Sequence, residues 1–240
     1  MFDIIAAVTL TLGAAALVGI LIAVGAPDRA TRLRMALGAT IWFALVVSLG
    51  AMGVFSLPAP LGTAAIGAAV MGPFVAGLVA LARSRSARAF ALGVPVAVLV
   101  AVNAGRLAGA FFVALYAAGR LPPTFALSAG WGDIAIGAAA IPLAWAIYRG
   151  LPGWRALALV WNTLGIADLV NAVTLGIGSA PDSPLRFMFE HPDSRAVTML
   201  PWVMIPGFLV PIYALVHVAL FARLAASAAN LHKVPLEGAA

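Results

Sequence analysis

The chain has 240 residues, of which 64% are hydrophobic and only 9% are charged. A soluble domain carries about a quarter charged residues, so this composition excludes an ordinary soluble fold and indicates a helical protein that crosses a membrane several times. The formal net charge of +6 comes mainly from arginines in short loops, which favours a lipid bilayer with anionic headgroups as the partner and argues against nucleic acid.

Seven apolar segments follow one another and predict an all-α, polytopic seven-helix transmembrane bundle. They run approximately over 3–25, 35–57, 61–82, 89–119, 127–148, 154–178 and 199–224. The first segment has no basic leader and carries Asp3, so we expect a retained helix rather than a cleaved signal peptide. Because no region is polar enough for a separate soluble domain, we expect one membrane domain over 1–225 and a short cytoplasmic tail over 226–240.

Two of these segments are irregular. The fourth has 31 residues, which as one helix would reach roughly 46 Å against a hydrocarbon core of about 30 Å. We therefore expect it to tilt, to extend into the cytoplasm or to bend near 103–105. The seventh segment contains Pro201, Pro206 and Pro211, and each proline removes a helical hydrogen bond, which predicts kinks or a late helix start.

The basic loops alternate along the chain. Three arginines lie in 26–34, three in 83–88 and two in 149–155, and Arg223 and Lys233 follow the last segment. The intervening loops are poorer in cations. By the positive-inside rule, this alternation predicts an outside N-terminus and a cytoplasmic C-terminus.

Arg106 is the most informative residue, since it lies inside the apolar stretch 94–119. A cation near mid-bilayer is costly, so it must face protein, water or a counter-charge. Asp133 and Asp168 lie in two later apolar segments. Counted from the outer helix ends, the arginine is close enough in depth for its long side chain to reach either carboxylate.

Two asparagines extend this set. Asn103 lies three residues before Arg106, and Asn171 lies three residues after Asp168, so each pair shares one face of its helix. We expect all four, together with Asp133, to converge in the outer half of the bundle.

His217 is the polar residue of the seventh segment, and Asn162 is its expected neighbour by depth. Its level is roughly 10 Å deeper than that of Asp168, counted along the helices. The ring is either a packing residue held by hydrogen bonds or one step of a polar path from Asp133 through Asp168 and Asn162.

Several kinds of cofactor chemistry have no support in the sequence. The depth of His217 argues against a metal site shared with the two aspartates, and the chain has no cysteine, so we expect no metal and no cofactor. The single lysine, Lys233, lies in the tail, which excludes a retinal Schiff base within the membrane.

Three stretches carry a set of recurring motifs: Arg106 to Gly137, with LPPTFA and AGWGD; 161–181, with WNTLGIAD; and 201–224, with IPGFLVP followed by a histidine. In these motifs the chain resembles an uncharacterised family of bacterial multi-pass integral membrane proteins. The polar positions that match are Arg106, Asp133, Asn162, Asp168 and His217. The resemblance implies a protein of the bacterial inner membrane and supplies no substrate.

Three functions fit these observations. The buried site binds or transports a small solute or protons, with Arg106 contacting an anionic ligand or gating Asp168. Alternatively, the charges only hold helices in register, and the chain is a structural or accessory subunit with a membrane protein partner. Third, an intramembrane enzyme uses Asp133 or Asp168 as general base on a lipid-like substrate, although the sequence shows no nucleophile–base pair. The catalytic residues are therefore unknown at this stage.

Overall fold

The computed structural model describes residues 1–181 and 183–231, and within these ranges it is helical with no strand. In the same ranges, seven helical spans are long and apolar enough to cross a membrane. They are Phe2–Gly25, Arg29–Ala51, Leu61–Arg83, Val96–Ala117, Pro123–Tyr148, Trp154–Ser179 and Ile205–Ala226. The seven predicted segments are thereby confirmed, and the chain is a multi-pass membrane protein by length and composition of its helices.

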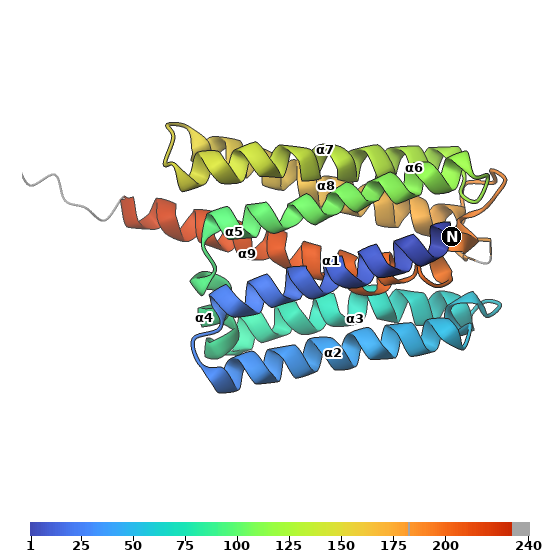
Figure 1. Ribbon diagram of the computed structural model, residues 1–240, viewed down its shortest axis with the longest axis horizontal. Helices are drawn as coiled ribbons and strands as arrows, with labels where there is room; N and C mark the ends of the chain where they lie inside the picture. The colour runs from blue at the N-terminus through green and yellow to red at the C-terminus, as the bar shows by residue number, and fades with distance from the viewer. Residues whose placement is uncertain (182, 232–240) are drawn as a thin grey trace, which may run out of the picture.

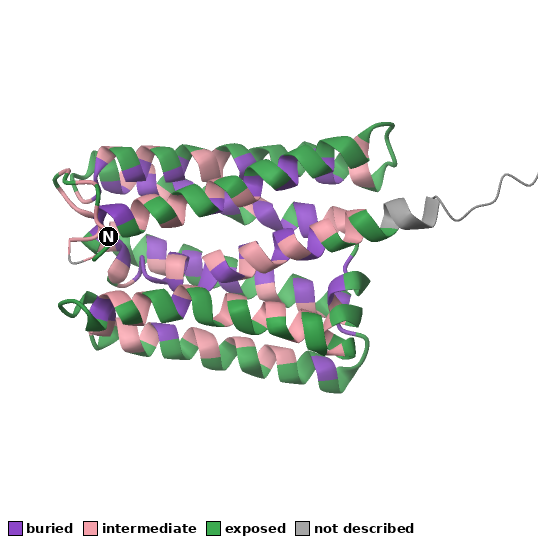
Figure 2. Ribbon diagram, turned by 180° about the vertical axis from the view of Figure 1, so that it is seen from behind, coloured by how far each residue is buried: buried purple, intermediate pink, exposed green. Residues whose placement is uncertain are grey.

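The helices differ in how central they are (Figures 1 and 2). α9 (Val210–Leu231) runs through the middle of the bundle, with α7 (Pro123–Tyr148) and α8 (Trp154–Ser179) on one side. α2 (Arg29–Ala51) and α3 (Leu61–Arg83) lie on the other side. In the apolar window of the last span 56% of residues are buried, against 6% in those of α2 and α3. The peripheral pair therefore presents most of its apolar surface to lipid.

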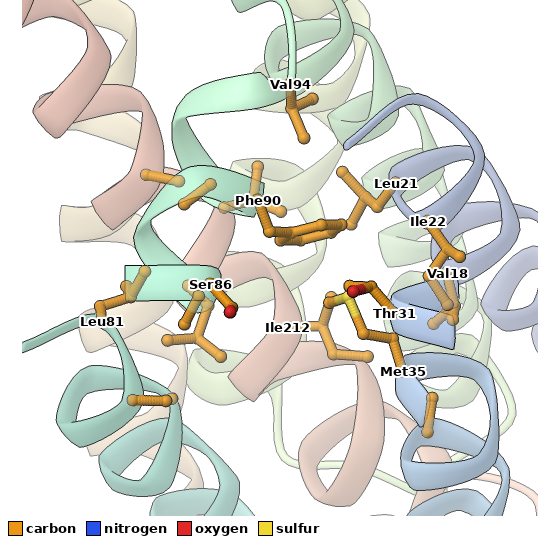
Figure 3. Close-up of a pocket in the computed structure, with 18 of the residues that line it drawn as sticks. Val18, Leu21, Ile22, Thr31, Met35, Leu81, Ser86, Phe90, Val94 and Ile212 are labelled. Carbon is orange, nitrogen blue, oxygen red and sulfur yellow. The ribbon is translucent and has the colours of Figure 1, made fainter. Parts of the chain in front are cut away.

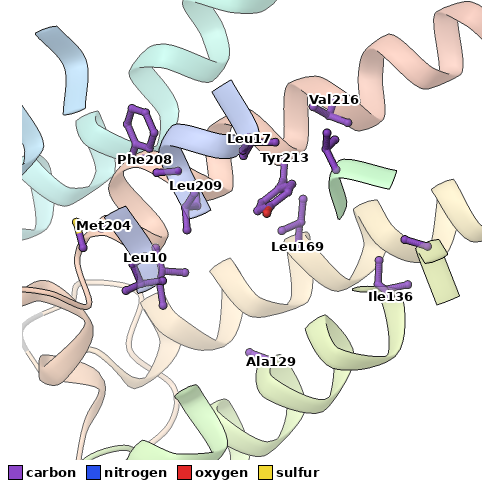
Figure 4. Close-up of a cluster of buried hydrophobic side chains, with 14 of the residues drawn as sticks. Leu10, Leu17, Ala129, Ile136, Leu169, Met204, Phe208, Leu209, Tyr213 and Val216 are labelled. Atoms are coloured by element: carbon purple, nitrogen blue, oxygen red, sulfur yellow. The ribbon is translucent and has the colours of Figure 1, made fainter. Parts of the chain in front are cut away.

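The core lies where α1 (Phe2–Gly25), α7, α8 and the last span meet (Figure 4). Leu10 and Leu17 reach it from α1, and Leu169 reaches it from α8. Phe208 and Tyr213 come from the last span. Arg106 and the polar side chains that contact it are enclosed by this core.

The long fourth segment is divided into four pieces. α4 (Arg85–Gly93) is a separate short helix whose first turn is capped by Ser84, the Oγ of which accepts the Ala87 N–H at 3.2 Å. It stops before Pro95, which cannot continue a helix. The crossing itself consists of α5 (Val96–Ala101), the 3₁₀ segment η2 (Val102–Gly109) and α6 (Ala110–Ala117). Both an extension beyond the crossing and a change of helix type at 103–105 are therefore present.

The seventh span starts late, as the prolines predict. Pro201 precedes it, and its first turn is the π-helical segment η4 (Ile205–Leu209), which contains Pro206. α9 then continues to Leu231. The predicted tail over 226–240 thus begins inside α9, whereas 232–240, including Lys233, lies outside the described residues.

The two ends of the bundle differ in charge. The α1–α2, α3–α4 and α7–α8 connections lie at the same end (Figure 1), and they carry the arginines of 26–34, 83–88 and 149–155. At the opposite end, the Arg120 guanidinium donates to the Asp3 carboxylate at 2.7 Å. The described part of the molecule therefore has one arginine-rich end and one end of mixed charge.

Candidate functional site

Arg106 is positioned by the 3₁₀ segment η2, which interrupts two stretches of α-helix. A 3₁₀ stretch within a helix is tighter than its neighbours and often occurs at functional positions. Asn103 bonds back to the preceding turn, its Nδ2 donating to the Leu99 carbonyl at 2.9 Å. The Arg106 side chain is directed into the bundle and is 1% exposed.

The guanidinium of Arg106 connects three other helices. Its Nε donates to Asp133 Oδ1 on α7 at 2.7 Å, and its Nη2 donates to Asp168 Oδ2 on α8. Nη1 donates to the Gly165 carbonyl of α8 at 3.1 Å and contacts His217 Nε2 on α9 at 3.2 Å. A guanidinium has five N–H groups and no acceptor, so these contacts occupy most of its hydrogen-bonding capacity.

The bonds around His217 fix which ring nitrogen carries the proton. Arginine donates only, so Nε2 of His217 must accept from Arg106. The other ring nitrogen, Nδ1, lies 2.7 Å from Asn162 Oδ1, while Asn162 Nδ2 donates to the His217 carbonyl at 3.0 Å. With the asparagine amide oriented in this way, its oxygen accepts and Nδ1 carries the hydrogen. The network is therefore satisfied by a neutral imidazole with its proton on Nδ1.

The indole of Trp161 supports this part of the site. Its ring centroid lies 5.5 Å from that of His217, and its Nε1 donates to the Ile136 carbonyl at 3.1 Å. The indole therefore links α8 to α7 and packs beside the imidazole.

Two glycines allow the polar groups to approach the helices closely. A Cβ at Gly165 would collide with the His217 ring, and a Cβ at Gly132 would collide with the Asp168 carboxylate. Because an alanine at either position needs the space that a polar group of the site occupies, these glycines are part of the site's construction.

The cluster formed by Arg106, Asp133, Asp168, Asn162 and His217 is largely enclosed. We call it the Arg106 cluster. Asn162 and His217 are fully buried, whereas the side chains of Asp133 and Asp168 are 14% and 12% exposed. A cavity of about 20 Å³ adjoins Arg106 and Asp133, with Tyr213 on its wall. That volume accommodates about one water molecule.

A larger cleft adjoins this small cavity. It has a volume of about 390 Å³ and lies between α1, α9 and the η2–α6 crossing, with Thr9 and Phe111 among its lining residues. The cleft and the cavity share the lining residues Gly105, Ala108, Leu209 and Tyr213, and a Cβ at Gly105 would meet the Tyr213 hydroxyl. Tyr213 is therefore the polar one of the residues that line both the cleft and the cavity beside Arg106.

The structure brings together five of the seven residues expected at the site and places two of them elsewhere. Asn171 does not join the cluster: it is exposed and donates to Ser128 Oγ at 2.8 Å, because it faces outward along the α7–α8 seam. Asn103 is buried and lies three residues from Arg106, but its side-chain N–H donates to a carbonyl of its own helix. Its Oδ1 has no hydrogen-bond partner among the described residues.

The expected neighbour of His217 is confirmed. Asn162 bonds to both Nδ1 and the backbone carbonyl of His217, and Asn162 lies six residues before Asp168 on α8, about 9 Å along a helix. The long Arg106 side chain contacts both Asp168 and His217, so the polar residues form one connected cluster.

Sequence reasoning did not find two contacts of the cluster. The Gly165 carbonyl is a backbone acceptor, which no side-chain pattern reveals, although a glycine three residues before Asp168 is the signal that a close approach leaves. The direct bond between Arg106 and His217 was hidden by the depth estimate. As to metals, the described residues hold no group of three histidine, aspartate or glutamate side chains placed to bind an ion.

Comparison with protein families identifies the family to which the chain with this site belongs. Residues 64–225 match the family described as Domain of unknown function (DUF8737). The chain belongs to this family. The matched region of the DUF8737 protein contains the whole Arg106 cluster and all or nearly all of five of the seven spans, whereas α1 and α2 precede it. No curated protein and no solved structure matches the chain.

Proposed function

We propose that this DUF8737 protein binds protons at the Arg106 cluster and moves them across the membrane, alone or together with a small solute. The observation that carries this proposal is the charge balance, with one guanidinium facing two carboxylates inside the bundle. His217 bonds as a neutral ring, so the ionised cluster has one negative charge in excess. A net charge at this depth is costly, and uptake of one proton by Asp133 or Asp168 removes it.

The small size of the cavity favours a proton over an organic ligand in this conformation. Arg106 already donates to acceptors from three helices, so binding an anionic solute would require those bonds to be exchanged. The adjoining space of about 20 Å³ accommodates a water molecule and no larger group. A solute would have to enter through the 390 Å³ cleft beyond Tyr213.

The same cleft supports a route to the carboxylates. Thr9 and Tyr213 supply hydroxyl groups along a cleft that is otherwise apolar, and hydroxyl groups can relay protons through hydrogen bonds with water. Rotation of the Tyr213 side chain would join the cleft to the cavity beside Asp133. In this proposal Tyr213 gates proton access.

The proposed orientation follows the arginines. The arginine-rich end would face the cytoplasm, with the N-terminus outside, as the positive-inside rule predicts. The membrane would be the bacterial inner membrane, as the family resemblance implies.

Proton flux in proteoliposomes tests this function. The purified protein is reconstituted with an internal pH-sensitive dye, and a potassium gradient with valinomycin imposes a membrane potential. We expect flux with the wild-type protein, and a loss of most of it in Asp168→Asn and Arg106→Met. Asn171→Ala is the matched control, because it alters a polar residue of the same helix that lies outside the cluster. Flux that is equal in all four proteins would contradict the proposal.

A structural role is the second candidate, and a specific observation favours it. The Arg106 guanidinium is satisfied by acceptors from α7, α8 and α9, which is the arrangement expected of a residue that only holds helices together. In that case the protein would be an accessory subunit, would conduct no protons and would co-purify with a stoichiometric membrane partner.

A further inference from the structure

A second cavity lies between α1, α2, α3, α4 and α9 (Figure 3). Its volume is about 510 Å³, within the range of about 300–1,000 Å³ that is usual for small-molecule sites. Most of its wall is hydrocarbon, with Leu21, Met35, Phe90 and Ile212 among the lining side chains. No member of the Arg106 cluster lines it. An occupant would therefore be largely apolar.

The polar lining residues are confined to the arginine-rich end. They are Thr31, Arg34, Ser84 and Ser86. Arg34 is exposed and donates from Nη2 to Thr31 Oγ1 at 3.3 Å, which uses one of the five N–H groups of a guanidinium. The remaining groups suit a phosphate, which arginine binds through charge-assisted hydrogen bonds.

The surrounding charge selects an anionic headgroup. Several arginines lie within two residues of the lining residues Thr31, Ser84 and Ser86 in the sequence: Arg29, Arg32, Arg83, Arg85 and Arg88. The acidic residue among them, Asp28, is engaged as the N-cap of α2, accepting from Thr31 N and Thr31 Oγ1 at 2.8 Å. Such a cationic end attracts anionic lipids more strongly than zwitterionic ones.

α4 forms one wall of the cavity at the arginine-rich end. Ala87, Phe90 and Ala91 of this helix line the cavity, whereas Arg85 and Ala89 are on its exposed side. This division is that of an amphipathic helix lying in the membrane interface. The Arg88 guanidinium fixes α4 to the end of α3 by donating to the Leu81 and Ala82 carbonyls at 3.2 and 2.6 Å.

We propose that this cavity binds an anionic glycerophospholipid, with an acyl chain among the apolar side chains and the phosphate at Arg34, Ser84 and Ser86. The apolar wall, the polar rim and the positive charge belong to the same end of one cavity, which matches the layout of such a lipid. The site is separate from the Arg106 cluster and does not depend on the proposed proton function.

Native mass spectrometry of the full-length protein in detergent tests the proposal. The protein is titrated with phosphatidylglycerol and with phosphatidylcholine of the same acyl chains. We expect tighter binding of phosphatidylglycerol, and an affinity for it about fivefold weaker in Arg34→Gln. Arg155→Gln is the matched control, because it removes an exposed arginine of the arginine-rich end that does not line the cavity, and it should bind as the wild type does.

A second pair of variants tests the apolar part. Ala87→Phe fills the cavity and should weaken binding of both lipids by about tenfold or more, whereas Ala89→Phe makes the same change on the exposed side of α4 and should not. If Ala87→Phe fails to fold, Ala39→Phe fills the cavity from α2. Binding that is equal in the filled and control variants would overturn the proposal. Displacement of the lipid by inorganic phosphate alone would also overturn it, because it would show an anion site without a place for the chain.

Discussion

Replacing Arg106 with methionine is the most informative change to the stability of the bundle. Methionine has a similar length and is apolar, so the substitution removes the charge and the donors while keeping much of the volume. It leaves Asp133 and Asp168 without their counter-charge and leaves the Gly165 carbonyl and His217 Nε2 without a donor.

The magnitude follows from what is left uncompensated. Removing one partner of a buried ion pair costs about 3–5 kcal/mol in soluble proteins. Here one guanidinium serves two carboxylates, so we expect Arg106→Met to lower the free energy of unfolding by about 5 kcal/mol, the upper end of that range. Adding Asp133→Asn and Asp168→Asn to the same chain removes the unpaired charges and should recover a large part of the loss.

The matched control is Arg120→Met. Arg120 pairs with Asp3 at the surface, where the two side chains are 36% and 49% exposed, and it lies 5.7 Å from the Trp202 ring. Exposed pairs and cation–π contacts contribute about 1 kcal/mol each at most, so the control should lose no more than about 1–2 kcal/mol. Steric trapping in bicelles measures each free energy of unfolding. An Arg106→Met loss equal to that of the control, or no recovery in the triple variant, would refute the reasoning.

Three further predictions concern individual contacts. Gly165→Ala should destabilise the protein by about 1–3 kcal/mol, because the added methyl group meets the His217 ring. Gly72→Ala is the control, since Gly72 has open space around it, and it should cause no such loss. Thermal melting in detergent compares the two variants. Nitrogen NMR of histidine-labelled protein should show His217, assigned by its loss in His217→Phe, as a neutral ring protonated at Nδ1; a ring protonated at Nε2 would contradict the bonding scheme. Hydrogen bonds from Thr31, the backbone N–H foremost, hold the pKa of Asp28 below its ordinary value. The stabilisation from this cap is therefore complete above the ordinary value of about 3.9 and is lost as the pH falls through the lower folded-state pKa, so the melting difference between wild type and Asp28→Ala should shrink only in strong acid.

The number of membrane-spanning helices and the members of the Arg106 cluster could be predicted, because the alternatives to each have a large free-energy cost. A run of about twenty apolar residues has few alternatives to a membrane span, and a buried arginine must find acceptors. Arg106 with Asp133 and Asp168 therefore followed from composition and approximate depth, and His217 with Asn162 followed from depth alone.

The arrangement within the cluster could not be predicted in the same way. Depth gave the level of each residue, but it did not show how far the Arg106 side chain extends along the bundle, so its contact with His217 was not expected. Asn171 shares a helix with Asp168, yet it turns to Ser128 on the outer seam. Depth thus gave the correct carboxylate partners of Arg106, whereas helix spacing wrongly placed Asn171 with them.

Infrared difference spectroscopy between low and high pH tests the central claim, that the Arg106 cluster takes up and releases a proton. We predict a carboxyl C=O band from an enclosed, protonated aspartic acid in the wild-type protein at low pH. The band should disappear at high pH and be missing at every pH in Asp133→Asn/Asp168→Asn. Spectra of the wild type and of this double variant that differ by no titrating band would contradict the claim and leave the cluster as a staple between helices.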